Sequence, residues 1–125
     1  KSFGFNLPFI GGVRLKDKAI FIRQLATMLD AGIPMSEALE VIVSQTKNSQ
    51  LEEMLEDVRK GVEGGASLSK ALADHPSVFD KIFVAVVSAG EESGKLPEVL
   101  LQLAEELEKE EDFNAKLRAS MVYPT

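Results

Sequence analysis

Apolar side chains recur along this chain at the spacing of one α-helix face, and glycine, proline or a polar break interrupts each stretch. The first stretch has apolar residues or glycine at i, i+4, i+7, i+8 and i+11: Phe21, Leu25, Met28, Leu29 and Gly32. Proline follows shortly after Gly32, and this order is typical of a helix end. Short helices joined by short connections favour antiparallel packing of sequence neighbours.

The pattern predicts six helices and no convincing strand. The expected starts are residues that begin helices well or open a periodic stretch: Asp17, Ser36, Ser49, Ser67, Ser77 or Val78, and Pro97. The expected ends are glycines, prolines or polar breaks: Gly32, Lys47, Gly61, Asp74, Gly90 and Pro124. The last helix, of about 25 residues, would be ~38 Å long, which exceeds the others.

The apolar stripes of the last two helices define part of the expected core. The fifth helix presents Phe79, Ile82, Phe83 and Val86. The sixth presents a row of leucines, continued near its end by other apolar residues: Leu96, Leu100, Leu103, Leu107, Leu117 and Met121. We therefore expect residues 13–125 to form an all-α, antiparallel six-helix bundle with a long C-terminal helix.

Residues 1–12 fit neither a helix period nor a strand period. They combine glycine and proline with scattered aromatic residues: Phe3, Gly4, Phe5, Pro8, Phe9, Gly11 and Gly12. This composition predicts a flexible linker or arm. Its aromatic side chains either dock on a partner or on the domain surface, or the segment is a disordered end.

The composition excludes several kinds of function. The chain has no cysteine and a net charge of −6, so thiolate metal sites and a strongly basic nucleic-acid face are not expected. The single histidine, His75, precedes a proline, and neither a Gly-x-Ser-x-Gly motif nor a phosphate-binding loop is present. We predict that the domain is not an enzyme, holds no organic cofactor and binds no nucleic acid.

The negative charge is concentrated near the sixth helix. Residues 91–112 hold nine acidic side chains and two lysines. Three readings are open. The face is simply solvated; or Glu105, Glu108 and Asp112 weakly bind a divalent cation such as Ca²⁺ or Mg²⁺; or the charge steers a basic partner.

A second candidate site is the segment between the fifth and sixth helices, with Gly90, Glu91, Glu92, Gly94 and Leu96. The glycines permit positive φ or close backbone approach. The carboxylates are expected to accept hydrogen bonds from the first amides of the sixth helix, where the helix dipole favours negative charge. The segment is thus either a tight capped turn or a surface that faces a partner, and both roles are compatible.

Several segments, in this order, resemble one family. They are residues 25–39, the glycine then Ser-Leu then Ala-Leu pattern of residues 64–72, Phe79, the Ala-Gly-Glu-Glu-Ser-Gly-Lys-Leu run of residues 89–96, and residues 116–124. Together they resemble a cytoplasmic domain of the inner-membrane platform proteins of type II secretion and type IV pilus systems, the general secretion pathway F family. The resemblance covers about residues 13–125.

The resemblance implies a non-catalytic scaffold at the cytoplasmic face of the bacterial inner membrane. It implies contacts with an assembly ATPase and with other inner-membrane platform proteins, and a homodimer or higher oligomer. The chain resembles the first of two copies of this domain, so we expect a transmembrane helix to follow Thr125 in the parent protein. Lys116 and Arg118 fit the cytoplasmic side of such a helix.

Some alternatives remain at this point. A pilus system and a secretion system are not distinguished. A stand-alone helical adaptor or regulatory interaction domain is the main alternative function. A metal-dependent hydrolase that uses the carboxylates of the sixth helix is a third, but the chain offers no set of histidine ligands for it.

Overall fold

The computed structural model describes residues 9–10 and 12–122, and six helices account for most of them. The helices are α1 (Leu15–Asp30), α2 (Met35–Gln45), α3 (Ser49–Glu63), α4 (Leu68–Ala73), α5 (Lys81–Ser93) and α6 (Leu96–Val122). Two two-residue strands, β1 (Phe9–Ile10) and β2 (Val13–Arg14), pair antiparallel just before α1. The prediction of an all-α fold with six helices is confirmed.

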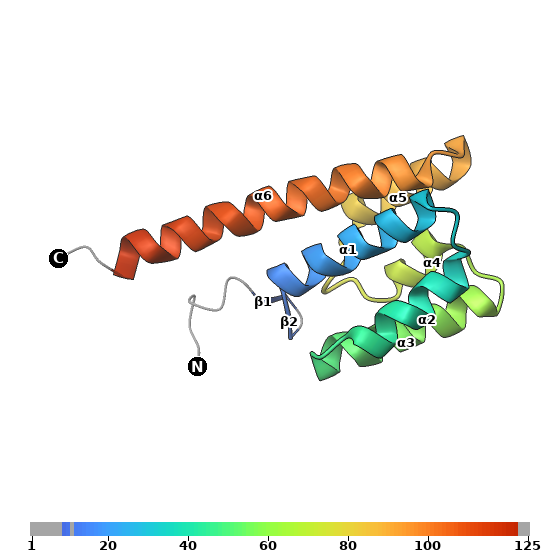
Figure 1. Ribbon diagram of the computed structural model, residues 1–125, viewed down its shortest axis with the longest axis horizontal. Coiled ribbons are helices and arrows are strands. Elements are labelled where there is room, and N and C mark those ends of the chain that lie inside the picture. The colour runs from blue at the N-terminus through green and yellow to red at the C-terminus, as the bar shows by residue number, and fades with distance from the viewer. Residues whose placement is uncertain (1–8, 11, 123–125) are drawn as a thin grey trace.

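The helices are arranged around α1, as Figure 1 shows. α6 packs most extensively against α1 and runs in the opposite direction, while α2 and α3 form a pair on the other side of α1. α4 and α5 pack on each other, and α5 also packs on α6. α6 has 27 residues and extends past the other helices, so the long C-terminal helix is also confirmed.

All six helices contribute to one hydrophobic core. Each supplies at least one side chain that is fully shielded from solvent: Leu25, Leu39, Leu55, Leu72, Val87 and Leu100. Of the predicted leucine stripe in α6, Leu100, Leu103 and Leu107 are buried and Leu96 is half-buried against the core. Leu117 is exposed, and the side chain of Met121 lies outside the described part of the chain.

Side-chain caps set three of the helix starts. Ser67 accepts a hydrogen bond from the amide of Lys70 at the start of α4, as predicted. Asn48 caps α3 and Asp80 caps α5 in the same way.

The predicted cap of α2 is wrong, because Ser36 lies inside the helix. The extended backbone of Pro34 ends the preceding turn, and its carbonyl accepts the first helical hydrogen bond from Ala38.

The predicted bounds of α5 are also wrong, and of its predicted apolar face only Phe79 and Phe83 are buried. The carbonyl of His75 accepts hydrogen bonds from the amides of Val78 and Phe79, so a turn precedes the helix and α5 begins only at Lys81. The helix continues through Gly90 to Ser93. Its buried side consists of Phe83, Val87 and Gly90, at i, i+4 and i+7. Ile82 and Val86 therefore lie outside the core, and Ile82 is 76% exposed.

No helix in the described part of the chain has both the length and the apolar composition needed to cross a membrane. The expected roles of Phe3, Phe5, Tyr123 and Pro124, and that of the Phe9 side chain, fall outside the described part of the chain.

Candidate interaction surfaces

The connection between α5 and α6 is a compact helix stop. Gly94 has φ +74°, which is the left-handed conformation that glycine adopts without strain. The amide of Lys95 donates to the carbonyl of Gly90 at 2.9 Å, and the amide of Gly94 donates to that of Glu91 at 3.4 Å. This pair of bonds forms a Schellman motif, which satisfies carbonyls at the end of α5. α6 begins directly afterwards, at Leu96.

Gly90 allows α5 and α6 to approach closely. It is buried within α5, and a Cβ atom placed on it would lie 3.0 Å from both Cβ and Cγ2 of Val99. In protein structures, a Cβ atom seldom lies as close as 3.0 Å to a carbon of another residue. Helix packing therefore favours glycine at Gly90, whereas backbone conformation favours it at Gly94.

Glu91 and Glu92 do not act as predicted. Because α5 extends to Ser93, both lie in its last turn, and neither makes a hydrogen bond to α6 within the described residues. Glu91 instead accepts from the amide of Ser69 at 3.1 Å and from its hydroxyl at 2.6 Å. Ser69 is buried in the first turn of α4, so Glu91 ties α5 to a helix start 22 residues earlier. Glu92 is exposed.

We expect Glu91→Ala to destabilise the domain, because it removes a charged acceptor from a buried serine. The free energy of unfolding should fall by about 1 to 3 kcal/mol, measured by chemical denaturation. The matched control is the neighbouring Glu92→Ala, which should change it by less than about 0.5 kcal/mol. Equal effects of the two substitutions would show that the contact with Ser69 contributes nothing.

The predicted divalent site has a different arrangement in the structure. The guanidinium of Arg23 on α1 donates to both carboxylate oxygens of Glu108, at 2.8 and 2.6 Å. These hydrogen bonds hold the pKa of Glu108 below its usual value and raise that of Arg23. Asp112 pairs with Lys116 at 3.2 Å, and Glu105 is exposed. Among residues 9–10 and 12–122, no three acidic or histidine side chains are placed to hold a metal ion. A cation at Glu108 would have to compete with Arg23.

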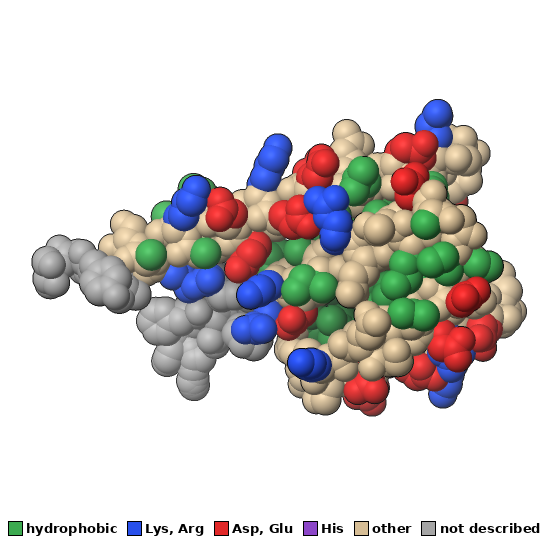
Figure 2. Space-filling view, in the orientation of Figure 1, with side chains coloured by type: hydrophobic (Ala, Val, Ile, Leu, Met, Phe, Trp, Pro, Cys, Tyr) green, Lys and Arg blue, Asp and Glu red, His purple; other side chains and the backbone are tan. Residues whose placement is uncertain are grey.

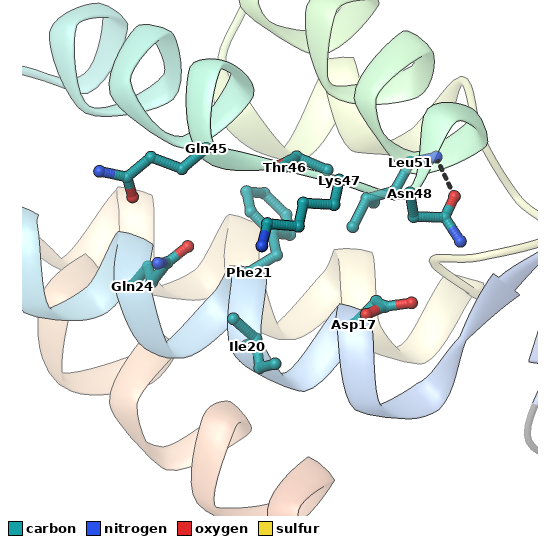
Figure 3. A pocket seen from close by; sticks show the side chains of 9 residues that line it. All are labelled: Asp17, Ile20, Phe21, Gln24, Gln45, Thr46, Lys47, Asn48 and Leu51. Carbon is teal, nitrogen blue, oxygen red and sulfur yellow. Dashed lines mark hydrogen bonds between the residues drawn. The ribbon is translucent and has the colours of Figure 1, made fainter.

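Two neighbouring recesses lie along α1, and Ile20, which is 46% exposed, borders both. One, of about 200 Å³, lies between α1 and the α2–α3 connection, and Figure 3 shows Gln24 and Lys47 on its opposite sides. The other, of about 320 Å³, lies between α1 and α6 and is lined by Lys16 of α1 and by Glu108, Glu111 and Asp112 of α6. Figure 2 shows hydrophobic patches interleaved with charged side chains on this face of the molecule. A charged side of α6, whose three carboxylates pair with Arg23, Lys116 and Arg118, thus forms one wall of a partly apolar groove beside Ile20.

One unusual residue, Lys18, was not expected from the sequence. It is only 7% exposed, and its ammonium group donates to the carbonyl of Val78 at 2.6 Å. The same group lies over the rings of Phe79 and Phe83, at 5.3 and 4.8 Å from their centroids. Its position was visible in the pattern, because Lys18 precedes Ile22 and Leu25 by four and seven residues on the core-facing side of α1.

Burial lowers the pKa of Lys18 below its usual value, although nearby Asp80 and Glu110 oppose the shift. In the pH range between the folded and unfolded pKa values, the unfolded chain binds more protons, so stability rises with pH. We expect the free energy of unfolding of the wild type to increase relative to Lys18→Met as the pH rises from 7 towards 10. Denaturation at several pH values measures this difference. A constant difference would mean that the ammonium group keeps its ordinary pKa.

Comparison with known proteins identifies the family. Residues 21–125 match the model of the family described as type II secretion system (T2SS), protein F. The chain belongs to the type II secretion system protein F family. This membership confirms the resemblance seen in the sequence motifs.

Individual relatives agree with this result. The chain is 48% identical, over 90% of its length, to the type IV pilus assembly protein PilC of Thermus thermophilus. It is 40% identical to PilC of Myxococcus xanthus, over 95% of its length, and 40% identical to the type II secretion system protein F of Vibrio cholerae, over 99%. The chain spans 28% of each of the two PilC proteins and 30% of the Vibrio protein.

Proposed function

We propose that this chain is a non-catalytic scaffold domain of an inner-membrane assembly platform, in type IV pilus biogenesis or type II secretion. The observation that carries the proposal is the family match over residues 21–125. Relatives named for pilus assembly and for secretion reach similar identities, so the proposal covers both systems. The domain works by contacts with an assembly ATPase and with other platform proteins, and as a homodimer or higher oligomer. It acts at the cytoplasmic face of the inner membrane, as part of a membrane-embedded parent protein.

The arrangement of side chains supports binding in preference to catalysis. Every helix packs into one core, and the two recesses beside Ile20 lie along α1, one against α6 and one against the α2–α3 connection. His75 pairs with Asp57 at 2.8 Å between α3 and the α4–α5 connection, and within the described residues it contacts no serine or threonine hydroxyl. A nucleophile and its base must lie within hydrogen-bond reach of each other.

The groove beside Ile20 is the surface that we assign first to the ATPase or another platform protein. It combines an exposed apolar side chain with paired charges of both signs on its α6 wall. Charged side chains at such a surface can exchange their partners for those of a charged protein, and they make the association depend on ionic strength. No cofactor takes part in the proposed role.

The test is binding of the purified assembly ATPase from the same organism to this chain, measured by calorimetry or interferometry. We expect saturable binding that weakens as salt is raised from 50 to 300 mM. The control is Ile20→Lys, whose circular dichroism should match the wild type and whose affinity should fall about tenfold. If neither the ATPase nor any other purified platform protein binds, the scaffold function is wrong for this domain.

A further inference from the structure

The outer side of α5 carries an unpartnered apolar stripe. Ile82, Ala85, Val86 and Ala89 lie at i, i+3, i+4 and i+7, and all four are exposed. The opposite side of the helix is already used, because it packs against α4 and α6. Nothing in the folding of the described chain therefore accounts for this second apolar side of α5, which we call the α5 stripe.

An acidic recess of about 190 Å³ lies at the start of the α5 stripe, between α5 and α6. Its apolar lining comes from Phe83, Leu103 and Leu107, and Ile82 borders it. The exposed charges that line it are all carboxylates: Asp80, Glu106 and Glu110.

The carboxylates of the acidic recess lack cationic partners at the surface. The only lining base is Lys18, which is buried and donates to the carbonyl of Val78. Asp80 caps α5, and no ion pair within the described residues engages Asp80, Glu106 or Glu110, although the buried ammonium group of Lys18 attracts Asp80 and Glu110 from below. A positively charged group placed in the recess would meet negative charge above an apolar floor.

These features favour a helix over a membrane as the occupant. An anionic bilayer surface would be repelled by the three carboxylates. A helix fits, because its own apolar anchors recur at i, i+3, i+4 and i+7, and because Ala85 and Ala89 are small enough to let its backbone approach. A lysine or arginine has an aliphatic stem for the apolar lining and a charged head for the rim.

We propose that the α5 stripe and the acidic recess together bind an amphipathic helix of a partner protein, with a lysine or arginine about one turn beyond its apolar anchors. The anchors pack on Ile82 and Val86, and the basic side chain enters the recess. The inference rests on the proposed function in one respect only, namely that the partner protein would belong to the same assembly platform. The surface lies on α5, apart from the groove beside Ile20.

The test uses two synthetic helical peptides with the same apolar anchors, one with arginine and one with glutamate at the position that would enter the recess. Each is titrated into the ¹⁵N-labelled chain and followed by amide chemical shifts. We expect the arginine peptide alone to give saturable shifts at residues 80–90 and 106–110. Ile82→Lys should weaken its binding about tenfold, as for a central anchor. The matched Ile20→Lys should leave it unchanged.

Several results would overturn the inference. Equal binding of the glutamate peptide would show that the acidic recess does not select a basic side chain. If neither peptide bound, the α5 stripe would not be a binding surface for a helix. Shifts of the α5 stripe that appear on concentrating the chain alone would assign it to a second copy. Shifts with vesicles of anionic lipid would assign it to the membrane. Since no ATPase is present, failure here leaves the proposed scaffold function standing, and failure of ATPase binding leaves this surface standing.

Discussion

Replacing Phe79 with alanine should lower the free energy of unfolding by about 3 to 5 kcal/mol. Phe79 is 1% exposed, and its ring packs against Phe21 and Phe83 with centroids 6.1 and 5.3 Å away. The substitution leaves a cavity where α1 meets the start of α5, and it also removes one of the two rings beneath the ammonium group of Lys18. Chemical denaturation followed by circular dichroism measures the loss.

Phe113→Ala is the matched control, because Phe113 is 61% exposed on the projecting part of α6. It should change the free energy of unfolding by less than about 0.5 kcal/mol. A similar loss for both phenylalanines would mean that the aromatic cluster around Phe79 is not part of the core.

Replacing Gly90 with valine should destabilise the domain by about 1 to 3 kcal/mol through overpacking. The new Cβ would lie 3.0 Å from Val99, and the additional methyl groups would force α5 and α6 apart. Thermal and chemical denaturation should both show the loss. The double substitution Gly90→Val with Val99→Ala should recover part of it, since the second change removes the atoms that clash.

Gly61→Ala is a control for glycine removal in general. Gly61 lies inside α3, and a Cβ there would meet Ala71 at 3.5 Å, which is ordinary contact. Alanine should therefore stabilise the domain by up to about 1 kcal/mol through helix propensity. If Gly90→Val were equally stabilising, close packing of α5 on α6 would not explain Gly90.

The helices were predictable because local signals decide them. Apolar periodicity, the cap at Ser67 and the glycine and proline stops follow from residues within a few positions of one another. The start of α5 was not predictable in this way, since the turn at His75 and the cap at Asp80 compete with an apolar pattern that continues through both.

The α5 stripe shows a second limit of the sequence pattern. Periodicity predicts which side chains share a helix face, but α5 is apolar on two sides. Only packing against α4 and α6 shows that Phe83 and Val87 face the core while Ile82 faces outward. In sequence, an apolar helix side that binds a partner cannot be distinguished from one that is buried in the core.

The contacts of the candidate sites were the least predictable part. Glu91 bonds Ser69 across 22 residues, Lys18 bonds Val78 across 60, and Glu108 bonds Arg23 across 85. Such pairs depend on how the helices pack, so the sequence indicated charged and glycine-rich segments without indicating their partners. The family, by contrast, was recognisable from short motifs along the chain, and the family match over residues 21–125 agrees with them.

The central claim is that this domain acts by holding an assembly platform together. The most direct measurement removes residues 13–122 from the full-length protein in its own organism and follows pilus assembly or secretion, together with the ATPase in the membrane fraction. The shortened protein must reach the membrane in normal amount, as judged by immunoblot. The account predicts loss of pili or of secretion and release of the ATPase from the membrane. Normal assembly with the ATPase still bound would contradict it.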